Sequence, residues 1–126
     1  MRTTNIGGKK VELRASPLAL LFYRQEFGKD LLDDFKDLQS LEELAKKNSN
    51  SFRFEDLRLM DFFQLAYALN RAAGKPSEFF PSYEEWLYGI ELDLGEMDWI
   101  ADVVYEAADG FFRTGEPSPK PNSKTK

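Results

Sequence analysis

The stretch between residues 54 and 73 constrains the fold more than any other part of this chain. When its residues are placed 100° apart, as in an α-helix, apolar side chains fill most of the circumference. One narrow polar strip remains, made of Asp61, Gln64 and Arg71. A helix this apolar has to be covered on several sides by other elements. We therefore expect residues 54–73 to form the central helix of a helical domain, ended by Gly74.

Helix-starting and helix-ending residues predict further helices before this one. Pro17, directly after a serine, is typical of a helix start, and Gly28 is placed to end that helix. A second helical stretch begins near Lys29. The capping-box sequence that starts at Ser40 predicts a break in this stretch, so that a short separate helix covers residues 41–47.

Two more helices are expected in the last third of the chain. A second capping box starts at Ser82 and predicts a short helix that ends at Gly89. A similar polar start at Asp93 predicts a last helix that runs to about Arg113.

The length of 126 residues fits a single domain. We expect a mainly α fold, in which residues 1–113 form one compact domain of about five to six helices. Residues 2–14, with a glycine-rich turn between alternating segments, predict a β-hairpin at its start. Residues 114–126 contain three prolines and no aliphatic or aromatic side chain, which predicts a disordered tail.

The composition argues against catalysis and against metal binding. The chain has no cysteine, which removes disulfides, thiolate nucleophiles and Cys-based zinc sites, and no histidine, which removes the usual general base. The turn from Gly7 to Lys10 lacks the spacing and the helix of a phosphate-binding loop. The many carboxylates alternate with apolar positions, as on a solvated helix face. We expect no enzyme activity, no cofactor and no metal site.

The charges are unevenly distributed along the chain. Residues 76–112 carry ten acidic side chains and no basic one, whereas residues 1–75 carry 13 basic and 11 acidic ones. The acidic third should repel nucleic acids and anionic membranes and attract basic surfaces. No apolar run approaches the roughly 20 residues that span a bilayer, and no apolar signal-peptide segment is recognisable near the N-terminus. These features predict a cytoplasmic protein that binds neither nucleic acid nor membrane.

The last predicted helix carries a candidate interface. Asp98, Asp102 and Glu106 form an acidic stripe beside its apolar face, and Trp99 and Val103 lie beyond the stripe. Like charges four residues apart cost roughly 0.2–0.5 kcal/mol per pair, so local helix stability does not explain the stripe. One hypothesis is that the stripe and the two apolar side chains face a partner protein. The alternative is that Trp99 and Val103 contact another helix of the same domain.

Phe79 and Phe80 form a second candidate contact. They are adjacent in a predicted loop between Pro76 and Pro81. Two neighbouring aromatic side chains rarely both face solvent without a partner. We expect one ring to pack on the core and the other to be available for binding. The alternative is that both rings serve the core alone.

The order of elements resembles the tail assembly chaperones of long-tailed bacteriophages and of related prophages of Gram-positive bacteria. The resemblance lies in the Gly-Lys turn of Ile6–Leu13, in the helix end at Tyr23–Leu32, in the apolar helix around Leu57–Arg71 and in Ser82–Leu87. It implies a small helical protein that coats the tape-measure protein and recruits subunits of the major tail protein, which forms the tail tube. It implies no catalytic residues, and places the protein in the cytoplasm of an infected or lysogenic bacterium.

Two further possibilities follow from the residues themselves. The acidic third would also suit an inhibitor or mimic that occupies a basic site on a host protein. The predicted hairpin has an edge strand that could support self-association.

Overall fold

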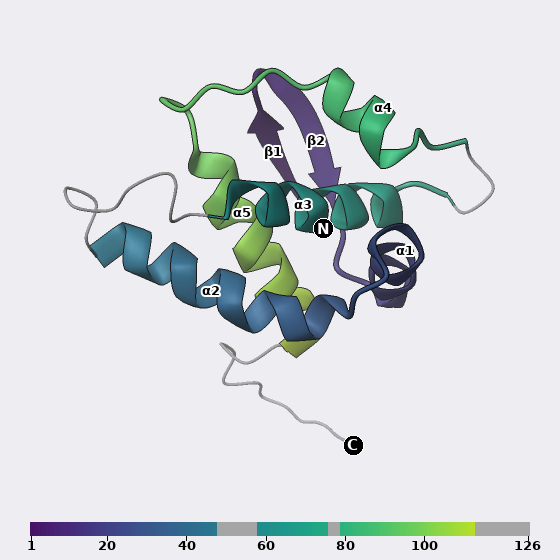
Figure 1. Cartoon of the computed structure of the whole chain (residues 1–126), viewed down its shortest axis with the longest axis horizontal. Coiled ribbons are helices and arrows are strands. Elements are labelled where there is room, and N and C mark those ends of the chain that lie inside the picture. Colours follow the sequence, from purple (N-terminus) through teal and green to yellow (C-terminus); the bar gives the residue numbers. More distant parts are fainter. Residues whose placement is uncertain (48–57, 76–78, 113–126) are drawn as a thin grey trace.

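A computed structural model of the chain describes residues 1–47, 58–75 and 79–112 (Figure 1). It is mainly helical, with a two-stranded antiparallel sheet at the N-terminus, as predicted. The predicted tail at residues 114–126 lies outside the described residues. In chain order the elements are β1 (Arg2–Ile6), β2 (Lys9–Leu13), α1 (Pro17–Phe27), α2 (Leu31–Lys47), α3 (Leu59–Ala73), α4 (Tyr83–Tyr88), α5 (Asp98–Ala107) and a π-helical segment, η2 (Ala108–Phe112).

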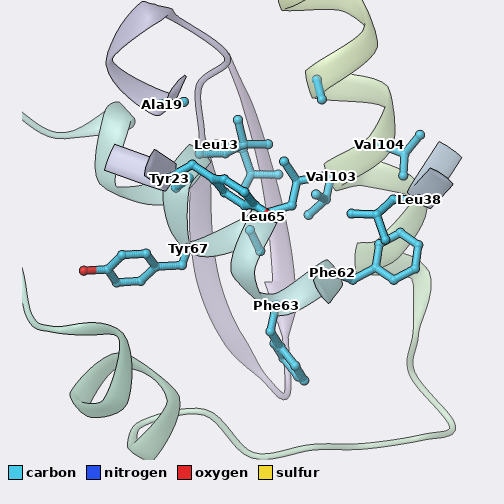
Figure 2. Close-up of a cluster of buried hydrophobic side chains, with 14 of the residues drawn as sticks. Leu13, Ala19, Tyr23, Leu38, Phe62, Phe63, Leu65, Tyr67, Val103 and Val104 are labelled. Carbon is cyan, nitrogen blue, oxygen red and sulfur yellow. The ribbon is translucent and has the colours of Figure 1, made fainter. Parts of the chain in front are cut away.

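The central position of the apolar helix is confirmed. Helix α3 packs against β2 and against all four other α-helices, and it crosses the middle of the molecule in Figure 1. Figure 2 shows Leu65 of α3 between Leu13 of β2 and Val103 of α5, all of which are buried. The helix begins at Leu59, after Arg58 in a left-handed conformation with φ of 57°. The predicted first residues, 54–57, lie outside the described residues.

Helices α1 and α4 begin and end where the sequence predicts. Gly28 follows α1 in a left-handed conformation, with φ of 69°, and donates its N–H to the carbonyl of Arg24 at 2.8 Å. At the start of α4, the Ser82 hydroxyl accepts the Glu85 N–H at 3.2 Å, and the Glu85 carboxylate accepts the Ser82 N–H at 3.4 Å. This is the capping box that the sequence indicates.

The predicted break in the second helix is wrong. Helix α2 is continuous from Leu31 to Lys47, and the capping-box sequence lies within it. Leu31, Phe35 and Leu38 are buried at helical spacing, and the half-buried Leu41 extends the same face. Burial of this continuous apolar face outweighs the weak local preference of Ser40 for a helix start.

The last helix begins later than predicted. The Asp93 carboxylate accepts the N–H of Gly95 at 2.9 Å in a local turn, and α5 starts only at Asp98. The helix continues as η2, in which Gly110 lies so close to Ala15 that a Cβ atom there would overlap the alanine side chain. The predicted end at Arg113 lies outside the described residues.

A polar network joins α1, α2 and α3 at one side of the core. The Tyr23 hydroxyl donates to the Asp34 carboxylate at 2.7 Å, and the ammonium of Lys29 lies 3.3 Å from the same carboxylate. Lys29 also donates to Gln64 at 3.0 Å and lies 3.9 Å from Asp61, so two of the three polar-strip residues of α3 face this lysine. Burial, together with the hydrogen bond to Asp34, raises the pKa of Tyr23 well above its usual range.

Alkaline solution should therefore unfold the protein through its buried tyrosines. The raised pKa of Tyr23 means that the unfolded state loses this proton first, above the tyrosine pKa of about 10. The stability that the neutral hydroxyl contributes is present below that pH and is lost as pH rises above it. We expect the free energy of unfolding to fall steeply above pH of about 10. The Tyr23→Phe variant, measured by urea unfolding at a series of pH values, should show a shallower fall. Equal slopes for both proteins would contradict this assignment.

Candidate interaction surface

The hypothesis that Trp99 and Val103 face a partner is wrong. Trp99 is 1% exposed and stacks on Phe63 of α3, with ring centroids 4.8 Å apart, and Val103 is fully buried. Helix α5 packs against β1, α2 and α3 together, so side chains around most of its circumference are covered. The two residues belong to the core, as the alternative interpretation holds.

Two members of the acidic stripe are used inside the molecule. Asp102 accepts a hydrogen bond from the Thr4 hydroxyl at 2.7 Å. Glu106, only 6% exposed, accepts the N–H of Ala15 at 3.0 Å and lies 3.5 Å from the Arg2 guanidinium. These contacts join the N-terminal hairpin to α5. As charge-assisted hydrogen bonds and an ion pair, they offset the like-charge repulsion along the helix. Glu106 is buried and is therefore not available to a partner, so its assignment to the interface is wrong. Asp102 is half-buried and Asp98 is exposed, and their contact with a partner stays a prediction.

The two adjacent phenylalanines have different surroundings. Phe80 is half-buried, and its ring meets Tyr67 edge to face at 5.5 Å between centroids. Phe79 is 87% exposed. Only Phe79 of this pair is therefore available as an anchor for a partner.

An aromatic cluster holds α4 against the body of the protein. Tyr67 of α3 contacts the rings of Phe27, Phe80, Tyr83 and Trp86. Figure 2 shows the Tyr67 side chain projecting out of α3, and its hydroxyl donates to the carbonyl of Pro81 at 2.7 Å. These aromatic contacts fix the backbone around α4, so side chains there that point outward are held in place at little entropic cost.

The exposed apolar side chains of this region are its most unusual feature. Tyr88, at the end of α4, is 93% exposed, and the following loop exposes Leu92 to 53% and Leu94 to 47%. Together with Phe79 they define what we call the 79–97 surface. Figure 1 shows this part of the chain running along one edge of the molecule, from α4 past the tip of the hairpin to α5. The exposed carboxylates that surround these side chains are Glu84, Glu85, Glu91, Asp93 and Glu96.

Sequence reasoning missed three of these four residues. Tyr88 falls in a predicted helix, where an apolar residue is assigned to the core by default. Leu94 falls in the first turn of the predicted last helix and Leu92 lies just before it, so neither was identified as an exposed contact. The available signal was the position of Tyr88 at the end of a six-residue helix and of the two leucines in the loop that follows it.

The hairpin tip holds the loop of the 79–97 surface in place. Gly7, with φ of 59°, lies against the carbonyl of Glu91, and a Cβ atom on Gly7 would overlap that oxygen. Gly8 has φ of 85° and open space around its Cα atom. Both glycines have conformations that suit the two-residue turn, but only Gly7 is also needed for close packing.

We expect Gly7→Ala to destabilise the protein more than Gly8→Ala. Gly8→Ala meets only the left-handed backbone penalty of about 1–2 kcal/mol. Gly7→Ala adds to that penalty the displacement of the 89–97 loop, at about 1–3 kcal/mol for overpacking. Urea unfolding of the two variants measures this difference. Equal losses in the two variants would show that the hairpin tip does not support the loop.

Comparison with known proteins identifies no relative. No family model matches the chain, and no curated protein or solved structure is significantly similar to it. Within residues 1–47, 58–75 and 79–112, no group of three or more acidic side chains is placed to hold a metal ion. No helix in the same ranges is long and apolar enough to cross a membrane.

Proposed function

We propose that this chain is a bacteriophage tail assembly chaperone, which binds the tape-measure protein and recruits subunits of the major tail protein. The observation that carries the proposal is the 79–97 surface, where Phe79 and Tyr88 are almost fully exposed on a well-packed aromatic base. Exposed aromatic side chains on a rigid support are typical anchors of protein interfaces. The sequence resemblance supports the identity of the partners.

The proposed mode of action is binding without catalysis, in the cytoplasm of the bacterial host. In this role the chain would coat apolar segments of the tape-measure protein and recruit tail-tube subunits to them. Phe79, Tyr88 and the two leucines would pack against such a segment, which removes apolar area from water on both proteins. The surrounding carboxylates would favour client segments that have basic residues beside the apolar ones.

Co-expression tests the proposal. The tape-measure protein of the same phage should be largely insoluble when produced alone, and should be recovered as a soluble complex when produced with this chain. The complex should persist at 1 M salt, at which the Debye length is only about 3 Å, because apolar contacts carry it. A chain that fails to hold the tape-measure protein in solution at any salt concentration would refute the proposal.

A second candidate function is an acidic inhibitor of a basic host protein. The exposed carboxylates of residues 84–98 favour it, since no basic side chain lies between residues 76 and 112. Salt separates the two functions, because binding through exposed charges weakens strongly as ionic strength rises. A host protein captured from the bacterial lysate at low salt, and lost entirely at high salt, would support the inhibitor.

A further inference from the structure

The two edges of the N-terminal hairpin differ in their surroundings. The outer edge of β2 is covered by α3: the Glu12 carbonyl accepts the side-chain N–H of Asn70 at 2.8 Å, and the N–H of Arg14 donates to the carbonyl of Leu69 at 3.0 Å. No such covering contact is made with the backbone of β1 in the ranges that the structure describes. The hairpin therefore has one closed and one open edge.

The strand register shows which groups project from the open edge. Thr3 pairs with Glu12, and Asn5 pairs with Lys10. The N–H and carbonyl groups of Glu12 point away from β1, so those of Thr3, which is paired with it, point away from β2. Orientation alternates along a strand, so the N–H and carbonyl groups of Asn5, two residues later, point the same way as those of Thr3. Thr3 and Asn5 thus direct two N–H groups and two carbonyl groups outward, and both residues are exposed.

This edge lacks the features that usually protect an edge strand. Thr3 and Asn5 are uncharged, and β1 has no proline, lysine or bulge. Its one charged side chain, Arg2, is paired with Glu106 and Asp109 of the same chain. Natural proteins commonly use these devices to prevent an unpaired strand from adding a neighbour. The edge is thus an available template for a third strand.

The neighbourhood of the edge restricts which strand it would accept. A hollow runs beside β1 between Thr3 and Asn5 on one side and the carboxylates of Glu96, Asp98 and Asp102 on the other. The side chain of Thr4, which points inward, donates to Asp102, so Asp102 lies on the inward face of the sheet, and Glu96 and Asp98 line the same hollow. A strand added here would bring every second side chain towards them.

We propose that the open edge of β1 binds an extended, basic segment of a partner protein as a third, antiparallel strand. The segment would carry Lys or Arg at alternate positions, which face Glu96 and Asp98. A second copy of this chain fits poorly, since pairing of two β1 strands would bring both sets of carboxylates together. The proposal rests on the open edge of β1 and on the carboxylates of Glu96 and Asp98. It does not depend on the exposed apolar side chains of the 79–97 surface or on the identity of the client.

Backbone methylation of a probe peptide tests the pairing itself. The probe is an eight-residue peptide of alternating threonine and lysine, blocked at both ends. In the antiparallel pairing its threonine N–H groups point to β1, and its lysine N–H groups point to solvent. N-methylation of two threonines should weaken binding about tenfold or more, because two hydrogen bonds are lost. N-methylation of two lysines is the matched control and should leave the affinity nearly unchanged. Equal affinities of the two methylated peptides would overturn the proposal.

Charge variants of the full chain test the location of the site. Glu96→Lys with Asp98→Lys should abolish binding of the unmethylated peptide. Asp33→Lys with Glu84→Lys makes the same change in net charge at exposed first-turn positions of α2 and α4, away from the edge. This control should retain most of the binding. Equal losses in both double variants would show that only net charge matters and would overturn the proposal.

Blocking the edge separates a partner strand from a second copy. Thr3→Pro removes an N–H group that the hairpin does not use, so the pairing of β1 with β2 should survive. The variant should lose the peptide while it keeps the same sedimentation behaviour as the parent chain. A parent chain that sediments as a dimer, and becomes monomeric on this substitution, would show that a second copy occupies the edge and would overturn the proposal.

Discussion

Replacing Trp99 with alanine should lower the free energy of unfolding by about 3–5 kcal/mol, the usual loss for a large buried aromatic side chain. Trp99 is 1% exposed and stacks on Phe63 of α3. The substitution removes both the buried apolar area and the ring contact, and it leaves a cavity between α3 and α5. A loss of this size is a large part of the stability of a single domain, about 5–15 kcal/mol.

Urea unfolding monitored by circular dichroism measures this effect. Tyr105→Ala is the control on the same helix, because Tyr105 is 39% exposed, and it should cost about 1 kcal/mol or less. At temperatures at which Trp99→Ala stays folded, it should bind the tape-measure protein as the parent does. A variant that keeps its stability and loses the client would restore Trp99 as an interface residue.

Removing the two aromatic anchors, Phe79 and Tyr88, should have the opposite effect to Trp99→Ala: client binding should be lost and stability should be kept. Phe79→Ala with Tyr88→Ala should weaken binding of the tape-measure protein by about a thousandfold, because each hot-spot residue commonly contributes about 2 kcal/mol or more. The same double variant should change the free energy of unfolding little, within about 0.5–1 kcal/mol, since both side chains are almost fully exposed. Isothermal titration or pull-down with the soluble client measures the binding.

Leu21→Ala provides a matched control for this prediction. Leu21 is an exposed apolar residue of α1, with 47% of its surface accessible, and lies outside the 79–97 surface. Its replacement should leave client binding unchanged. A double variant of Phe79 and Tyr88 that binds as tightly as the parent, or a control that loses binding equally, would show that exposed apolar area at large, and not this surface, holds the client.

The parts of the fold that were predictable have local causes. Gly28 ends α1 because its left-handed conformation is cheap for glycine, and the capping box at Ser82 starts α4 through two hydrogen bonds within four residues. Such signals need no knowledge of distant segments. The capping-box sequence at Ser40 is equally local, but burial of Phe35 and Leu38 keeps α2 continuous through it.

The candidate site depended on contacts that no local pattern reveals. A helical wheel showed that Trp99 lies off the main apolar face of α5, but it could not show that α3 covers this side as well. In the acidic stripe of α5, Glu106 pairs with Arg2 and Asp102 accepts a hydrogen bond from Thr4, and both partners lie about a hundred residues earlier in the chain. The exposed side chain of Tyr88 was missed because its exposure depends on the tertiary packing around α4, and the local sequence does not reveal that packing.

Hydrogen exchange of the free chain and of its complex with the tape-measure protein tests the central claim most directly. If this chain acts by binding a tail protein through the 79–97 surface, amides in α4 and in the 89–97 loop should become slower to exchange in the complex. Amides of α2, on the far side of the core, should be unchanged. Protection confined to α2, with residues 79–97 exchanging as in the free chain, would contradict the account.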